Sequence, residues 1–207
     1  MTKLFIFGIG LVSQMLFAAR SFAQLFYTEK QKKVANPLIF WELSIVAALL
    51  MMAYGILRND IIIFAGQILN YVVYIRNISL KKEWRNSIFK TLSYGVPWLI
   101  FSWLFLTDSS YSWSQMMKVQ SSMCAVMALG WVGQIVFSSR FFYQWFYSEK
   151  RKESFFPLGF WVLSVVGGVL LSVYAMIRRD PILLAGQVLG ILIYMRNIYY
   201  NRKSLKD

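Results

Sequence analysis

The sequence predicts an all-α integral membrane protein with seven transmembrane helices. Two observations carry this prediction. Apolar residues make up 58% of the 207 residues and charged residues only 15%, and one three-helix unit occurs twice. A soluble domain has about 25% charged residues and about 45–50% apolar ones. Because the apolar residues also occur in long runs, the composition excludes a soluble protein.

The internal repeat appears when the sequence is shifted by 120 residues, which aligns the two halves without a gap. Residues 14–44 read QMLFAARSFAQLFYTEKQKKVANPLIFWELS, and residues 134–164 read QIVFSSRFFYQWFYSEKRKESFFPLGFWVLS. The match ends in two Tyr-x-Arg-Asn groups, at 74–77 and 194–197. Such self-similarity predicts a duplicated unit of about 65 residues.

Each copy contains three apolar runs of the ~17–25 residues that a membrane-spanning helix needs. Pro37 and Pro157 begin the second helix of each copy, where a missing N–H costs little. The first run imitates a secretory signal, but its recurrence inside the chain favours retention. The expected spans are 4–27, 38–57, 61–78, 124–147, 158–177 and 181–199.

One further apolar run, 92–106, lies between the copies. It is short for a span, so a re-entrant or interfacial helix is the alternative. With a spanning linker helix the two copies point the same way; without it they are inverted. We expect a 3+1+3 arrangement of parallel repeats, divided into 1–78, a linker at 79–121, and 122–207 with a short basic tail.

The positions of the basic residues test whether the two copies point the same way. With the N-terminus outside and the C-terminus inside, 15 Lys and Arg fall in inner segments and 5 in outer ones. This bias follows the positive-inside rule. Arg20 and Arg140 are the two that fall within the membrane. The net charge of +13 is therefore explained by topology, and no nucleic-acid partner is expected.

The sequence contains few of the residues on which common catalytic sites depend. The chain has no histidine and one cysteine, Cys124, which lies in an apolar run. Zinc sites and Ser-His or Cys-His catalysis need more than this. We expect no metal and no cofactor, and the residues show no catalytic constellation.

Three motifs of the second copy carry a family resemblance: Arg-Phe-x-x-Gln-Trp with Ser-Glu-Lys at 140–150, Phe-Trp-x-Leu-Ser at 160–164, and Gly-Gln followed by Tyr-x-Arg-Asn at 186–197. They resemble the lipid A biosynthesis N-terminal domain, found ahead of some lipid-A-disaccharide synthases. The helix layout is similar to that of SWEET and PQ-loop transporters. The resemblance implies the bacterial inner membrane and envelope glycolipids, but not glycosyltransferase activity.

Polar residues within spans usually face the bundle interior. Arg20 and Gln24 share one face of the first helix, and Arg140 and Gln144 repeat the arrangement. Two guanidinium groups flanking a central cavity would suit a phosphate or carboxylate. The alternative is that each arginine extends to the interface or pairs with Glu29 or Glu149.

The third helices carry a second polar stripe at Gln67, Asn70 and Tyr74, repeated at Gln187 and Tyr194. Amides and phenols in this arrangement suit sugar hydroxyls or a head group, but they also serve as hydrogen bonds between helices. The Tyr-x-Arg-Asn ends, and the aromatic pairs at 40–41 and 160–161, are expected to be interface anchors and belt residues.

Glu42 has no counterpart in the second copy, where Val162 stands. It is the candidate for proton coupling.

The leading functional hypothesis is a transporter-like or lipid-binding protein that handles an anionic lipid-linked sugar or glycolipid. The first alternative is a SWEET-like facilitator of neutral sugars. The second is a non-catalytic membrane partner of a glycosyltransferase. Membrane lipids are partners in every case.

Overall fold

The computed structural model describes residues 3–31, 37–81, 84, 86–106, 113–121, 124–151 and 156–203. All regular structure in these residues is helical. Seven of the helices are long and apolar enough to cross a membrane, and α5 is a single short helix. The helices are α1 (Lys3–Gln31), α2 (Leu38–Leu57), α3 (Ile61–Lys81), α4 (Ser87–Leu106), α5 (Trp113–Ser121), α6 (Cys124–Arg151), α7 (Leu158–Ile177) and α8 (Pro181–Lys203).

The expected spans are confirmed as helices, with differences at their ends. The first and third helices of each copy run three to four residues further than expected, because their polar last turns stay helical. The linker helix begins at Ser87 instead of at 92 and reaches 20 residues, which is long enough to span. Helix α5 was not expected. Lys32, Lys33 and the basic tail after Lys203 lie outside the described residues.

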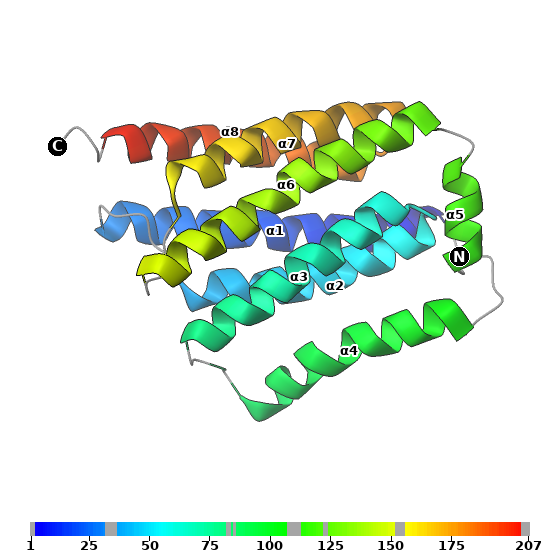
Figure 1. Cartoon of the computed structure of the whole chain (residues 1–207), viewed down its shortest axis with the longest axis horizontal. Helices are drawn as coiled ribbons and strands as arrows, with labels where there is room; N and C mark the ends of the chain where they lie inside the picture. The colour runs from blue at the N-terminus through cyan, green and yellow to red at the C-terminus, as the bar shows by residue number, and fades with distance from the viewer. Residues whose placement is uncertain are drawn as a thin grey trace.

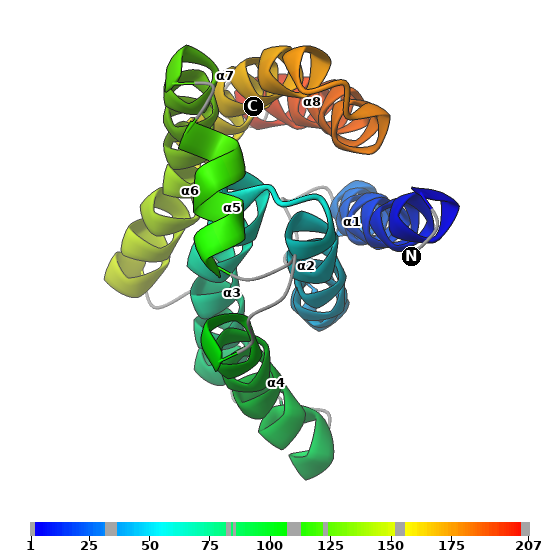
Figure 2. The ribbon, with the colours of Figure 1, turned by 90° about the vertical axis from the view of Figure 1, so that its right-hand side faces the viewer.

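Six helices form a closed ring in which each packs on its two neighbours, in the order α1, α2, α3, α6, α7, α8 and back to α1. Figure 2 shows this ring along the helix axes, with α4 outside it beside α3. Helix α5 crosses one end of the bundle, where it contacts α3 and α6 (Figure 1). Helix α1 begins at that same end and α8 finishes at the other.

The turns after α2 and α7 have the same build. The N–H of Asp60 bonds to the carbonyl of Gly55 at 2.8 Å, and that of Asn59 bonds to Ile56 at 3.0 Å. This pattern is a Schellman motif, which places Asn59 in the left-handed region, at φ 50°. Asp60 then caps α3, since its Oδ1 accepts hydrogen bonds from the N–H groups of Ile62 and Ile63 at 3.1 and 3.2 Å.

The two turns are joined to each other across the copies. The Tyr174 hydroxyl donates to Asp60 at 2.7 Å, and the Tyr54 hydroxyl donates to both oxygens of Asp180, at 2.8 and 2.9 Å. Arg178 pairs with Asp60 and Arg58 with Asp180, at 3.5 and 3.7 Å. Each aspartate is almost fully buried. The turns therefore lie at the same end of the bundle and hold it together there.

Aromatic rings fill the ring of helices near its other end. Trp41 of α2 packs on Phe156 with centroids 6.2 Å apart, and Phe160 and Trp161 of α7 pack on the same ring. Trp41 has no exposed surface, and the others are at most 5% exposed, including Phe40. The expectation that these residues form an interfacial belt is therefore wrong: their rings point inward and build the core between the copies.

Candidate functional site

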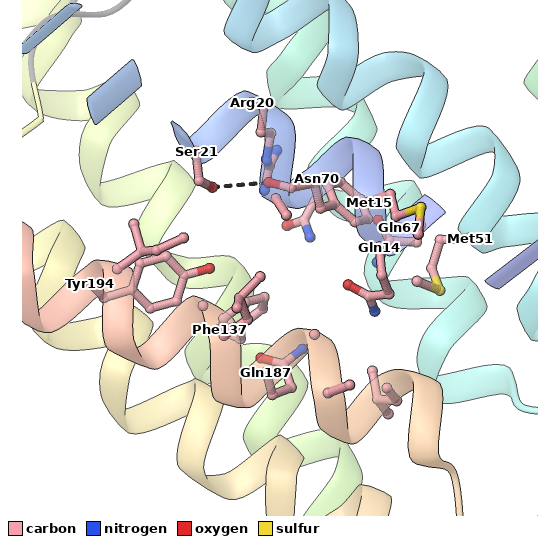
Figure 3. Close-up of a pocket in the computed structure, with 18 of the residues that line it drawn as sticks. Gln14, Met15, Arg20, Ser21, Met51, Gln67, Asn70, Phe137, Gln187 and Tyr194 are labelled. Atoms are coloured by element: carbon pink, nitrogen blue, oxygen red, sulfur yellow. Dashed lines mark hydrogen bonds between the residues drawn. The ribbon is translucent and has the colours of Figure 1, made fainter. Parts of the chain in front are cut away.

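A cavity of about 260 Å³ lies inside the ring, between the aromatic cluster and the paired turns. Figure 3 shows it in close-up, with side chains from several helices pointing into it. We call it the central cavity. Its walls come mainly from α1, α3, α6 and α8, with Met51 contributed by α2.

Both intramembrane arginines line the central cavity. Nη1 of Arg20 donates to Oγ of Ser44 at 2.6 Å, and its guanidinium carbon lies 4.5 Å from the centre of the Phe17 ring. Arg140 lies 3.5 Å from the ring centre of Phe137. Both guanidinium carbons lie within 6.0 Å of the Phe141 ring centre. Cation–π contacts thus bring both charges close to one aromatic ring.

These guanidinium groups keep free hydrogen-bond donors. Arg140 is 1% exposed, and its Nε and Nη1 have no hydrogen-bond partner among the described residues. Nε of Arg20 is likewise unpartnered. A buried charge without a full set of partners is costly in a folded protein. The site therefore has two buried cationic groups whose hydrogen-bonding capacity is not filled by the described residues, and guanidinium groups suit an anionic partner.

Within the described residues, no carboxylate lies within 4.0 Å of either arginine. The pairing of these arginines with Glu29 or Glu149, considered from the sequence, is wrong. Glu149 pairs with Arg76 at 3.1 Å and Glu29 with Arg196 at 3.9 Å, each across the two copies and exposed. The arginines of the Tyr-x-Arg-Asn ends thus neutralise those two carboxylates, and the charge in the cavity stays uncompensated.

The polar stripe of the third helices also reaches the cavity. Gln67, Asn70 and Tyr74 of α3 line it, as do Gln187 and Tyr194 of α8. The side-chain carbonyl oxygens of Gln67, Asn70 and Gln187 are buried and have no partner among the described residues. They leave hydrogen-bond acceptors in the cavity beside the arginine donors, a combination that suits a ligand with both an anionic group and hydroxyl groups.

The remaining candidates lie elsewhere. Gln24 lines a small extension of the cavity, past the arginines, with room for about one water molecule. Gln144 does not line the central cavity; its amide donates to Asn77 at 3.4 Å and to Ser148 at 2.9 Å. Glu42 lines neither space, and its Oε1 has no partner among the described residues. The structure therefore brings together seven of the ten candidates.

Sequence reasoning missed Gln14, Ser21, Phe137 and Phe141. Gln14 lies against Gly186, where a Cβ atom would come within 2.1 Å of its amide, and its repeat partner Gln134 lies in the same way against Gly66. The signal was available, because these glutamines align at the start of the repeat and face glycines that also align. Only the packing between copies shows that each glutamine needs a glycine from the other copy.

The model of the Lipid A Biosynthesis N-terminal domain family matches residues 9–79 and 129–199. Three similar curated proteins are called lipid-A-disaccharide synthase, from Chlamydia felis (29% identical, 98% of this chain), Chlamydia caviae (29%, 97%) and Chlamydia pneumoniae (28%, 86%).

The chain spans only about a third of the length of these relatives, with 34%, 34% and 30% of each covered. No solved structure matches it. The two family matches fall on the two copies of the repeat and together cover more than half of the chain. The protein therefore belongs to the Lipid A Biosynthesis N-terminal domain family, and this family is represented in it twice.

Proposed function

We propose that this protein binds an anionic glycolipid of lipid A metabolism in its central cavity and moves it within the bacterial inner membrane. The unpartnered donors of Arg20 and Arg140 carry the proposal. Guanidinium groups form paired hydrogen bonds with phosphate and carboxylate. The family match and the names of the relatives direct the choice of anion toward lipid A and its precursors.

The electrostatics of the cavity favour an anion over a neutral sugar. Among the described residues, no carboxylate lies within 4.0 Å of the two arginines. A neutral ligand would displace water from both charges and offer no opposite charge in return, which costs free energy. The amide oxygens of Gln67 and Gln187 supply acceptors for sugar hydroxyls. The SWEET-like facilitator of neutral sugars is therefore the weaker hypothesis.

The proposal includes the membrane topology: parallel repeats, with the N-terminus outside and the C-terminus inside. The paired turns of the two copies, joined by the Tyr54–Asp180 contact, support it because parallel copies bring these turns to one side. Accessibility labelling of single cysteines at Glu29 and Glu149, in a background without Cys124, tests the arrangement. Both positions should label from the cytoplasm; labelling from opposite sides would rule out parallel repeats.

Movement would come from the two copies rocking about the cavity. The aromatic cluster around Trp41 closes one end, and the Tyr–Asp pairs between the turns close the other. Opening one end at a time would expose the arginines to each side in turn, as in other transporters with repeated units.

A binding experiment tests the proposal directly. Purified protein in detergent is incubated with lipid A, with dephosphorylated lipid A and with phosphatidylcholine, and bound lipid is measured by native mass spectrometry. Lipid A should be retained and the other two should not. Arg20→Gln and Arg140→Gln should each lower retention, because each removes one of the two cationic groups.

Arg202→Gln is the matched control. Arg202 is exposed on α8, and its substitution changes the net charge by the same amount as the two cavity substitutions. Equal retention of lipid A by all three variants would remove the arginines from the site. Equal retention of lipid A and its dephosphorylated form would show that the cavity does not recognise the phosphate groups.

The relatives favour a second candidate function. In them, a segment similar to this chain belongs to a longer protein called lipid-A-disaccharide synthase. A membrane unit that holds a lipid substrate for such an enzyme would need the same cavity but no transport. Co-purification of a glycosyltransferase, with bound lipid but no lipid movement in proteoliposomes, would favour this role over the first.

A further inference from the structure

The two copies differ at one position beside the arginines. Phe141 of α6 follows Arg140, and its ring fills the space against Tyr74 of α3, with centroids 5.1 Å apart and no exposed surface. The equivalent residue on α1 is Ser21, which lines the central cavity and bonds back to the carbonyl of Phe17 at 3.0 Å (Figure 3). The repeat makes the α1–α8 contact the equivalent of the α6–α3 contact. The Phe141 ring fills the space between α3 and α6, whereas at the same height in the bundle Ser21 leaves the space between α1 and α8 open.

A second difference lies opposite on the third helices. Asn70 of α3 is 2% exposed, whereas its equivalent on α8 is Gly190, which has no side chain and also lines the cavity. Ser21 and Gly190 thus place two small residues on the facing helices α1 and α8. Both substitutions remove volume from the same side of the ring.

The outer edge of this side is apolar and exposed. Met15 on α1 and Leu189 on α8 line the cavity, and 59% and 41% of their surfaces are exposed. Their equivalents Ile135 and Leu69 are as exposed, at 59% and 39%, but do not line the cavity. The cavity thus reaches the outside of the bundle between α1 and α8, at a level that lies within the spans.

The volume of the cavity limits what enters it. At about 260 Å³ it is smaller than the ~300–1,000 Å³ of pockets that hold drug-sized ligands. One phosphorylated head group fits this volume, and acyl chains in addition do not. The apolar edge at Met15 and Leu189 provides a surface on which methylene groups can pack while they stay in the bilayer.

We propose that the opening between α1 and α8, lined by Ser21, Gly190, Met15 and Leu189, is a lateral portal through which a lipid enters the cavity head first, with its acyl chains left in the membrane. The proposal rests on the proposed function, because it needs an anionic head group at the arginines. It adds that the acyl chains of this ligand are directed along one defined seam, between α1 and α8.

Photo-crosslinking locates the chains. The probe is dioleoyl phosphatidic acid with a diazirine in one acyl chain, added to the full chain in nanodiscs of phosphatidylcholine, followed by peptide mass spectrometry. Crosslinks should concentrate on α1 and α8 near Met15 and Leu189, and an excess of unlabelled phosphatidic acid should remove them. Crosslinks as frequent at Ile135 and Leu69 would overturn the portal.

Closing the portal gives a second measurement. Ser21→Phe places at this seam the residue that the other copy has, and it should lower bound phosphatidic acid roughly tenfold or more, because its ring fills space that the bound lipid needs between α1 and α8. Val12→Phe is the control, since Val12 is exposed on α1 but does not line the cavity. Free glycerol 3-phosphate, which has no chains, should bind far more weakly than phosphatidic acid to the wild type.

The outcomes separate the two proposals. If Arg140→Gln abolishes phosphatidic acid binding while Ser21→Phe has no effect and crosslinks fall elsewhere, the anion site stands and the portal is wrong. If glycerol 3-phosphate binds as tightly as phosphatidic acid, the chains contribute nothing and the portal is again wrong. If neither phosphatidic acid nor lipid A depends on the arginines, both proposals fail.

Discussion

The hydroxyl of Tyr54 donates a hydrogen bond that is shared between both carboxylate oxygens of Asp180, which lies 126 positions further along the chain. Tyr174 makes the reciprocal contact with Asp60. Each aspartate also caps the third helix of its own copy. One carboxylate in each copy thus fixes its own turn and binds the other copy, so the two functions cannot be separated by a mutation of the aspartate.

Changing the tyrosines isolates the contact between copies. Tyr54→Phe and Tyr174→Phe each keep the ring but remove one of the donors of a buried carboxylate, which should lower the free energy of unfolding by about 1–3 kcal/mol. Thermal unfolding in detergent, followed by tryptophan fluorescence, measures it. Tyr94→Phe is the control, because the Tyr94 hydroxyl makes an exposed 3.4 Å contact. Unfolding temperatures equal to that of the control would show that these bonds contribute little.

Helix α4 is joined to the ring through a carbonyl group that its own proline leaves free. Pro97 has no N–H to donate to the carbonyl of Ser93, four residues earlier. The hydroxyl of Tyr71 on α3 donates to that carbonyl instead, at 2.8 Å. Tyr71→Phe should therefore destabilise the protein by about 1 kcal/mol or more. In a Pro97→Ala background the helix regains its own hydrogen bond, and Tyr71→Phe should cost less.

The same thermal unfolding assay measures all four proteins of this double-mutant cycle. A coupling energy of about 0.5 kcal/mol or more is expected for residues that share one partner. Additive effects of the two substitutions would mean that the Tyr71 hydroxyl does not replace the bond lost at Pro97.

The number and order of helices could be predicted because they depend on features that are local in the sequence. The apolar runs gave the spans, and Pro37 and Pro157 marked the starts of α2 and α7. The length of α4 was underestimated because its first turns, from Ser87 to Thr91, include Lys90 and lack the apolar character of the rest.

The cavity was predictable in part. Arg20 and Arg140 were found from the cost of charge in a membrane, and the structure brings both to one space. Spacing along one helix placed Gln144 on the same face, but it does not fix how far a side chain reaches, and Gln144 is used between helices instead. The difference between Ser21 and Phe141 was visible in the alignment, but which seam it opens depends on the packing of α1 against α8.

Close packing of the copies predicts the effect of a single methyl group. A Cβ atom on Gly66 would come within 2.1 Å of the Gln134 amide, which would have to shift away from its 2.9 Å hydrogen bond to Ser138, so Gly66→Ala should destabilise by about 1 kcal/mol. Gln134→Ala in the same protein removes the clash and should restore most of the loss. Gly8 has no neighbour within 4 Å of such an atom, so Gly8→Ala should stabilise slightly through helix propensity. Equal destabilisation with and without Gln134 would contradict this packing.

A last prediction separates a binding role for Arg140 from a structural one. The guanidinium is buried with two nitrogens unpartnered among the described residues, so it contributes less to folding than a fully paired arginine. Arg140→Met has a side chain of similar length without the charge. In detergent without added lipid, it should leave the thermal unfolding temperature unchanged or raise it, because removal of a buried and incompletely paired charge offsets the loss of the contact with the Phe137 ring.

Addition of lipid A should stabilise the wild type and not the variant, because a ligand stabilises only the state that binds it. A marked fall in unfolding temperature without lipid would instead identify Arg140 as part of the framework that holds α6 in place.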